Sequence, residues 1–289
     1  MRIAAAAAAL AFAGAAAPSA AQETQPAPAR QPAAAAGQPS AAEQEQLRRI
    51  AERGHLLFRI DNAARLTTRD LLPRLQNARS PDIAGWIAER DADGIVITYY
   101  ADAPGGPVAV YRARVAGTQI SGQELFAADA RPPLSAEQRR LAAARAAAGR
   151  LDRERCGTAP FNVFVIPPES ADGPVEVYKL SPLSQRARFP TGGHYLATIA
   201  PDGSIASSRA FANRCLDLQV PAVAAAGARP RPLSLVHILD PLPTEIHVFL
   251  SYLTGRPIVV ATGEPERVWI VERGRIGLIP PPSGPRQGR

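Results

Sequence analysis

The sequence contains little cysteine, a single lysine and none of the short motifs that mark the commonest enzyme sites. Two cysteines occur among 289 residues, and they do not form the C-x-x-C pair that is typical of redox or zinc sites. The chain also lacks a Gly-rich phosphate loop, a G-x-S-x-G turn and an H-E-x-x-H helix. The familiar nucleotide-binding, serine-hydrolase and zinc-protease signatures are therefore excluded.

Positive charge is plentiful but dispersed. The formal net charge is +7, Lys179 is the only lysine, and arginines are spread from Arg48 to Arg289 among carboxylates. Nucleic-acid binding requires basic residues to cluster on one face or stripe, and no such cluster stands out. We expect no nucleic-acid partner. A dispersed basic surface instead favours anionic components of a cell envelope.

Residues 1–21 have the three parts of an export signal. Met1 and Arg2 form a charged start, an apolar run follows to about Ala17, and small residues then supply a cleavage site before Gln22. No later run is long enough to cross a bilayer, which takes about 20 apolar residues. We therefore expect a mature chain without a transmembrane span, in the periplasm or secreted.

Export also determines how Cys156 and Cys215 are interpreted. An even number of cysteines in an exported chain indicates a disulfide, whereas a redox-active or metal-binding pair requires closer spacing. Closing a loop of about 60 residues would stabilise the fold by at most about 4 kcal/mol in the loop-closure model. We predict one Cys156–Cys215 disulfide.

Residues 22–40 predict a disordered tether, because they are rich in Pro, Ala and Gln and have no hydrophobic periodicity. Ser40 and Glu43 then resemble a capping box, which predicts a short helix through the apolar positions Leu47, Ile50 and Leu57.

A second helix is predicted to begin at Ser80. Pro81 occupies the favoured first-turn position, and Ile83, Trp86 and Ile87 follow at helical spacing. The pair Asp93-Gly94 then predicts a turn.

From residue 95 the pattern changes to β-branched and aromatic runs separated by turn residues, which predicts a three-stranded antiparallel meander. Ser135 and Gln138 form another capping box at the start of an Ala-rich helix. Together these elements predict an N-terminal α+β unit over residues 41–150.

A C-terminal α+β unit is predicted over residues 151–279, followed by a flexible tail over residues 280–289. Short strands dominate this unit, and Pro201-Asp202-Gly203 forms a turn between two of them. Thr244 caps a helix that Gly255 ends. The fold class is therefore α+β, with two small units built on antiparallel sheets, the second around one central helix.

Potential metal ligands occur in the C-terminal unit. Three histidines and a carboxylate are the candidate catalytic residues: His194, His237, Glu245 and His247. Imidazole and carboxylate ligands suit zinc, and Asp240 follows His237 closely. Each residue also has an ordinary structural interpretation, since histidines on strands pack and Glu245 complements the helix dipole. A Ser-His-Asp site would have to be assembled from scattered residues. We expect no metal and no cofactor.

Residues 233–276 resemble the C-terminal half of JAMM-type (MPN) domains, with a strand ending in His, a Pro-containing loop, a short helix and a closing hairpin. The resemblance implies an H-x-H-P metal motif, whereas this chain has His237-Ile238-Leu239-Asp240-Pro241 and carries His247 near the position of the family's Asp. The implied zinc set is incomplete. The whole chain also resembles exported proteins of GC-rich proteobacteria, to which no activity is attached.

The sequence therefore predicts an exported, non-catalytic protein that binds a partner protein or an envelope component. The alternative is a metal-dependent hydrolase with a degenerate JAMM-like site formed by the four candidate catalytic residues.

Overall fold

A 35-residue helix, α1 (Ala41–Leu75), begins the part of the chain that the computed structural model describes. The expected Ser40–Glu43 capping box is confirmed, because each residue's backbone N–H is bonded to the other's side chain. The helix is much longer than the sequence predicts. Its buried stripe continues past Leu57 through Ile60 to Leu71, with alanine and threonine between them that a search for large apolar residues misses.

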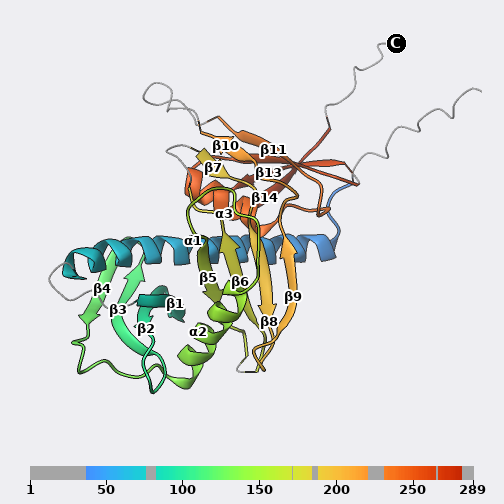
Figure 1. The fold of residues 1–289 in the computed structure, drawn as a ribbon. Helices are drawn as coiled ribbons and strands as arrows, with labels where there is room; N and C mark the ends of the chain where they lie inside the picture. The colour runs from blue at the N-terminus through green and yellow to red at the C-terminus, as the bar shows by residue number, and fades with distance from the viewer. Residues whose placement is uncertain are drawn as a thin grey trace, which may run out of the picture. The chain divides into compact units, whose positions relative to one another are not determined.

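The structure describes residues 37–75, 83–170, 172–183, 188–220, 231–264 and 266–281. The expected export signal, most of the tether and the last eight residues of the tail lie outside them. Figure 1 shows the ribbon coloured along the chain and labels most of its helices and strands by the names used here.

The first sheet contains β1 (Ile83–Asp91), β2 (Gly94–Ala101), β3 (Val108–Ala116) and β4 (Gln119–Leu125), in that order and antiparallel. The expected meander is thus present, with one strand more. The helix predicted from Ser80 is wrong over its described part, since Ile83, Trp86 and Ile87 lie on β1. Pairing with β2 along the whole strand overrides a spacing that fits either structure.

The capping box at Ser135 is confirmed and opens α2 (Ala136–Gly149). The second sheet has the antiparallel order β5-β6-β8-β9, formed by β5 (Asn162–Ile166), β6 (Val175–Leu180), β8 (Tyr195–Ile199) and β9 (Ile205–Ala210). The turn expected at residues 201–203 joins β8 to β9. A short pair, β7 (Arg188–Pro190) with β10 (Asp217–Gln219), lies outside this sheet.

The third sheet has the order β11-β12-β13-β14, formed by β11 (Leu233–His237), β12 (Ile258–Thr262), β13 (Arg267–Glu272) and β14 (Arg275–Ile279). Helix α3 (Glu245–Thr254) connects β11 to β12, which are parallel, whereas the other neighbours in this sheet are antiparallel. The expected end of α3 is confirmed, because Gly255 adopts a left-handed φ of 66°. The α+β fold class is confirmed.

The Cys156–Cys215 disulfide is confirmed, with the two Cα atoms 5.3 Å apart. No helix in the described residues is both long and apolar enough to cross a membrane.

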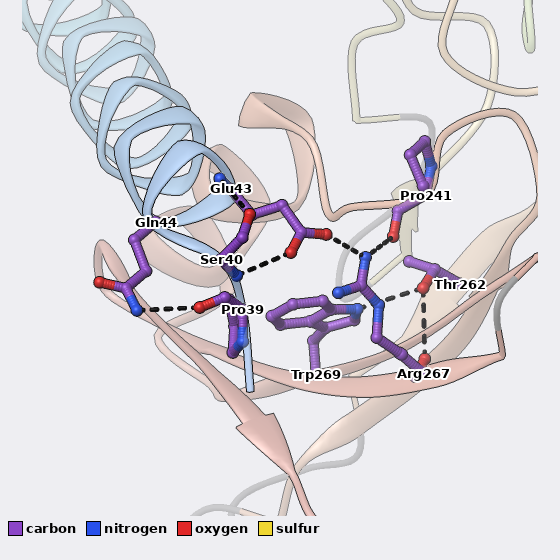
Figure 2. A network of polar contacts seen from close by, with 8 residues as sticks. All are labelled: Pro39, Ser40, Glu43, Gln44, Pro241, Thr262, Arg267 and Trp269. Atoms are coloured by element: carbon purple, nitrogen blue, oxygen red, sulfur yellow. Dashed lines mark hydrogen bonds and ion pairs between the residues drawn. The ribbon is translucent and has the colours of Figure 1, made fainter. Parts of the chain in front are cut away.

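The start of α1 is fastened to the third sheet by Arg267 of β13 (Figure 2). Its guanidinium donates to the Glu43 carboxylate over 2.7 Å and lies over the ring of Trp269. Only 6% of the Arg267 side chain is exposed. Because the same Glu43 also caps the helix, one carboxylate fixes both the first turn of α1 and its position on the sheet.

Farther along, α1 crosses α3 at a glycine. A methyl group at Gly54 would lie 2.5 Å from Val248 Cβ and 2.6 Å from the Glu245 carbonyl oxygen, well inside van der Waals contact. The helix also contacts β2, β3 and β5, so it packs against elements on both sides of residue 150. The boundary between the two expected units stays a prediction.

We predict that Gly54→Ala destabilises the protein by about 1 to 3 kcal/mol, because the added methyl overpacks the crossing. Helix propensity alone would give the opposite sign, a gain of about 1 kcal/mol. Urea unfolding of both proteins measures the difference. Gly149→Ala is the matched control, since a methyl group there meets no described atom within 4 Å. A stabilised Gly54→Ala protein would contradict the close crossing.

Candidate functional site

A first cavity, with a volume of about 670 Å³, lies where α1, β1, β5 and α3 meet. Eighteen residues line it: Asp61, Ala64, Arg65, Thr68, Arg69, Leu72, Pro73, Trp86, Asn162, Phe164, Leu180, Ser181, Leu183, Pro190, His194, Phe249, Leu250 and Leu253. Its volume is within the range of small-molecule sites, about 300 to 1,000 Å³.

Three aromatic side chains from different elements form much of the apolar wall. Phe164 of β5 packs against Trp86 of β1 at a ring distance of 5.7 Å and against Phe249 of α3 at 6.4 Å. Phe249 and Leu250 of α3 are buried. The wall therefore depends on contacts between residues more than 70 positions apart in sequence.

Polar groups reach the cavity from the C-terminal half of α1. Asp61 is buried and accepts a hydrogen bond from Arg65 Nε over 2.9 Å. Burial raises the pKa of the Asp61 carboxyl, and the Arg65 charge opposes this rise. Arg65, Thr68 and Arg69 follow on the same side of the helix, because residues spaced by three or four are neighbours there.

His194 lines the cavity as a neutral imidazole. Its Nδ1 accepts the Ser181 backbone N–H over 3.2 Å, so its proton is on Nε2, which donates to the Pro190 carbonyl over 2.8 Å. Burial lowers the pKa of His194 to about 4. With both ring nitrogens bonded to backbone, His194 shapes the cavity and offers neither a free base nor a free ligand.

The backbone around His194 is held by two glycines and the disulfide. A methyl group at Gly193 would lie 2.4 Å from both Cys156 Sγ and Ser181 Oγ, and one at Gly192 would lie 2.0 Å from the Arg214 carbonyl oxygen. Gly193 also has a left-handed φ of 67°. The chain passes this close to the disulfide only without side chains at these two positions.

His237 and His247 belong to a separate buried cluster outside the cavity. Their rings are 4.8 Å apart, and His237 Nε2 lies 2.8 Å from an Asp240 carboxylate oxygen that also accepts from Arg209. His247 Nδ1 accepts the Thr244 backbone N–H over 2.8 Å. Burial is the main cause that lowers the pKa of His247 to about 3. The N-terminal cap of α3 thus uses an imidazole as its acceptor.

Glu245 has a different partner. Its carboxylate accepts a hydrogen bond from the Tyr178 hydroxyl over 2.9 Å, and burial raises its pKa. The structure therefore brings His237, His247 and Asp240 together, places Glu245 beside Tyr178 and places His194 in the cavity. Within the described ranges, no group of three or more His, Cys, Asp or Glu residues is arranged to hold a metal ion.

Sequence reasoning missed the residues of α1 that border the cavity. Asp61 stands four residues after the buried Leu57 and one turn before the buried Ala64, so it is a charged residue within an apolar stripe. That pattern is a usable signal. The helix predicted from the sequence ends near Leu57, so it does not include Asp61.

No family model matches the chain, and no curated protein or solved structure matches it either.

We predict that the His194 imidazole stays unprotonated from pH 7 down to about pH 5. Its folded-state pKa of about 4 lies below the ordinary value of about 6.5, so the unfolded chain binds more protons between these values. The stability gained from the neutral ring is complete above pH 6.5 and falls by about 3 kcal/mol as the pH drops to 4.

NMR titration of the His194 ring measures this directly. The same nuclei in urea-unfolded protein are the control and should titrate near the ordinary value. A folded-state midpoint near pH 6.5 would contradict the burial of the His194 ring.

Proposed function

We propose that this protein is an exported binding protein, and that the cavity between α1 and α3 takes an amphipathic envelope component with an apolar body and an anionic group. The single observation that carries the proposal is the cavity itself, in which an aromatic and aliphatic wall meets polar side chains of α1. These side chains, Asp61, Arg65, Thr68 and Arg69, form the polar edge of the cavity. Small-molecule sites typically combine such a wall with a few polar groups that orient the ligand.

An anionic group is favoured by the arginines of the edge. Asp61 neutralises Arg65, whereas exposed Arg69 forms no ion pair with any described residue. The edge therefore has one excess positive charge beside the apolar wall. A carboxylate or phosphate attached to an acyl or aromatic body would place its charge at Arg69 and bury its apolar part.

Binding without catalysis is supported by the state of His194. A general base needs a free nitrogen and a pKa near the operating pH. His194 uses both nitrogens in backbone hydrogen bonds, and its pKa is about 4. The disulfide supports a location in an oxidising compartment, for which we propose the periplasm or the exterior.

The binding of dodecanoate tests this function. It is measured by the displacement of a fluorescent probe, anilinonaphthalene sulfonate, from the cavity. We expect saturable binding. Leu183→Glu should weaken it about tenfold, because it removes apolar wall and adds a repelling charge. Arg69→Ala should weaken it by about three- to tenfold through loss of the ionic contact.

Each variant has a matched control. Leu216 is as exposed as Leu183, 54% against 51%, and does not line the cavity, so Leu216→Glu should leave binding unchanged. Arg49→Ala is the control for Arg69→Ala, because Arg49 lies on the same helix and does not line the cavity; it should leave binding unchanged. Equal effects in a variant and its control, or no saturable binding by the wild-type protein, would refute the proposal.

A metal-dependent hydrolase is the second candidate, favoured by the proximity of His237, His247 and Asp240. A metal held there would have to compete with the Asp240 and Thr244 contacts of the two rings. We predict no stoichiometric zinc in protein purified without chelator, as measured by elemental analysis. About one zinc per chain that is lost in a His237→Ala His247→Ala variant would support the hydrolase instead.

A further inference from the structure

A second cavity of about 510 Å³ lies between α2 and strands β1, β2 and β5. Two arginines of α2, Arg139 and Arg145, line it together with Tyr100 of β2 and the nearby Asp102. Alanines and a glycine of α2 form much of the remaining wall, so the space is open beside the charged groups. None of the sequence motifs pointed to this site.

Arg145 is half-buried without a carboxylate partner among the described residues. Its guanidinium lies over the Trp86 ring at 5.4 Å, and Nη1 donates to the Val163 carbonyl over 2.5 Å. A guanidinium has five N–H donors and stays protonated in proteins, so several donors remain for a ligand. A positive charge removed from water in this way is costly unless an anion compensates it.

Tyr100 places a hydroxyl next to this guanidinium. Tyr100 is 5% exposed, and its hydroxyl has no hydrogen-bond partner among the described residues. The Tyr100 oxygen and Arg145 Nε each lie 2.8 Å from the position of a Cβ at Gly85. The absence of a side chain at Gly85 therefore leaves room for the Tyr100 hydroxyl and the Arg145 guanidinium to lie close together. Both residues line the cavity.

Arg139 and Asp102 determine which anions suit the site. Arg139 adds a second positive charge, while its Nη1 donates to the Leu134 carbonyl over 2.5 Å. Asp102 is exposed and forms no ion pair within the described part of the chain. Its negative charge at the same cavity disfavours anions of high charge. A singly charged oxyanion fits this balance better than a dianion such as sulfate.

We propose that this second cavity binds a singly charged oxyanion group, a carboxylate or a phosphodiester, with Arg145 and Tyr100 as donors and Arg139 as an additional charge. The planar guanidinium fork matches two oxygens of either group. The site is distinct from the first cavity, because no residue lines both. Arg145 of the second cavity lies against Trp86 of the first.

Titration of the full mature chain with benzoate and with dimethyl phosphate at constant ionic strength tests the proposal, with calorimetry as the readout and sulfate as a third titrant. We expect saturable binding of at least one monoanion and weaker binding of sulfate. The two monoanion titrations distinguish a carboxylate ligand from a phosphodiester.

Arg145→Gln should weaken binding at least tenfold, and Tyr100→Phe about threefold, because they remove an ionic and a neutral hydrogen bond respectively. Asp102→Asn should strengthen binding, since it removes a repelling charge. Tyr100→Phe and Asp102→Asn keep the test decisive if Arg145→Gln fails to fold.

Arg150→Gln is the matched control, because Arg150 is an exposed arginine at the end of the same helix and does not line the cavity. Leu183→Glu, in the first cavity, should leave the binding of dimethyl phosphate unchanged, because this anion has no apolar body for the wall of the first cavity. The proposal is overturned if the wild-type protein binds no monoanion saturably, or if Tyr100→Phe and Asp102→Asn bind as Arg150→Gln does.

Discussion

The close crossing of α1 and α3 at Gly54 is the constraint on which the first cavity depends. Helix α1 carries the polar edge, and α3 carries Phe249, Leu250 and Leu253 of the apolar wall. Their separation is set where the Gly54 backbone rests against Val248. The Glu43–Arg267 ion pair fastens the start of α1 to β13 (Figure 2), so the helix is fixed both at its start and at the crossing. A shift of α1 would therefore move the edge relative to the wall.

The part of the first cavity formed by Ser181 and His194 is held in place by a disulfide and by close backbone packing. Cys156 and Cys215 are 59 residues apart, and their bond lies against the Gly192-Gly193 backbone that positions His194. The disulfide thus contributes more than a loss of entropy in the unfolded chain, because it forms part of the surface on which this turn packs. Ser181 and His194 are presented to the cavity by a backbone that has little freedom to move.

Local rules account for the parts of the fold that the sequence predicts well. The capping boxes at Ser40 and Ser135 and the glycine after α3 depend on residues three to ten positions apart, and all are present. The spacing of Ile83, Trp86 and Ile87 fits a helix equally well. Only pairing with β2 makes it a strand, and that contact is a tertiary one. The length of α1 was missed for a related reason, since its small buried residues gain their burial from other elements.

The candidate site could be predicted only in part, because its residues converge from separate elements. His237 and His247 meet because a short loop joins β11 to α3, whereas His194 immediately precedes β8 of another sheet and lies near the disulfide. All three histidines could be named from the sequence by residue type alone. The structure places His247 in the cap of α3, His237 beside Asp240 and His194 in the wall of the first cavity. Among the residues that line the two cavities, the arginines without an ion pair to a described residue are Arg69 at the first cavity and Arg139 and Arg145 at the second. For a chain with this much dispersed positive charge, the informative arginines are those that the fold removes from carboxylates and places beside an open cavity.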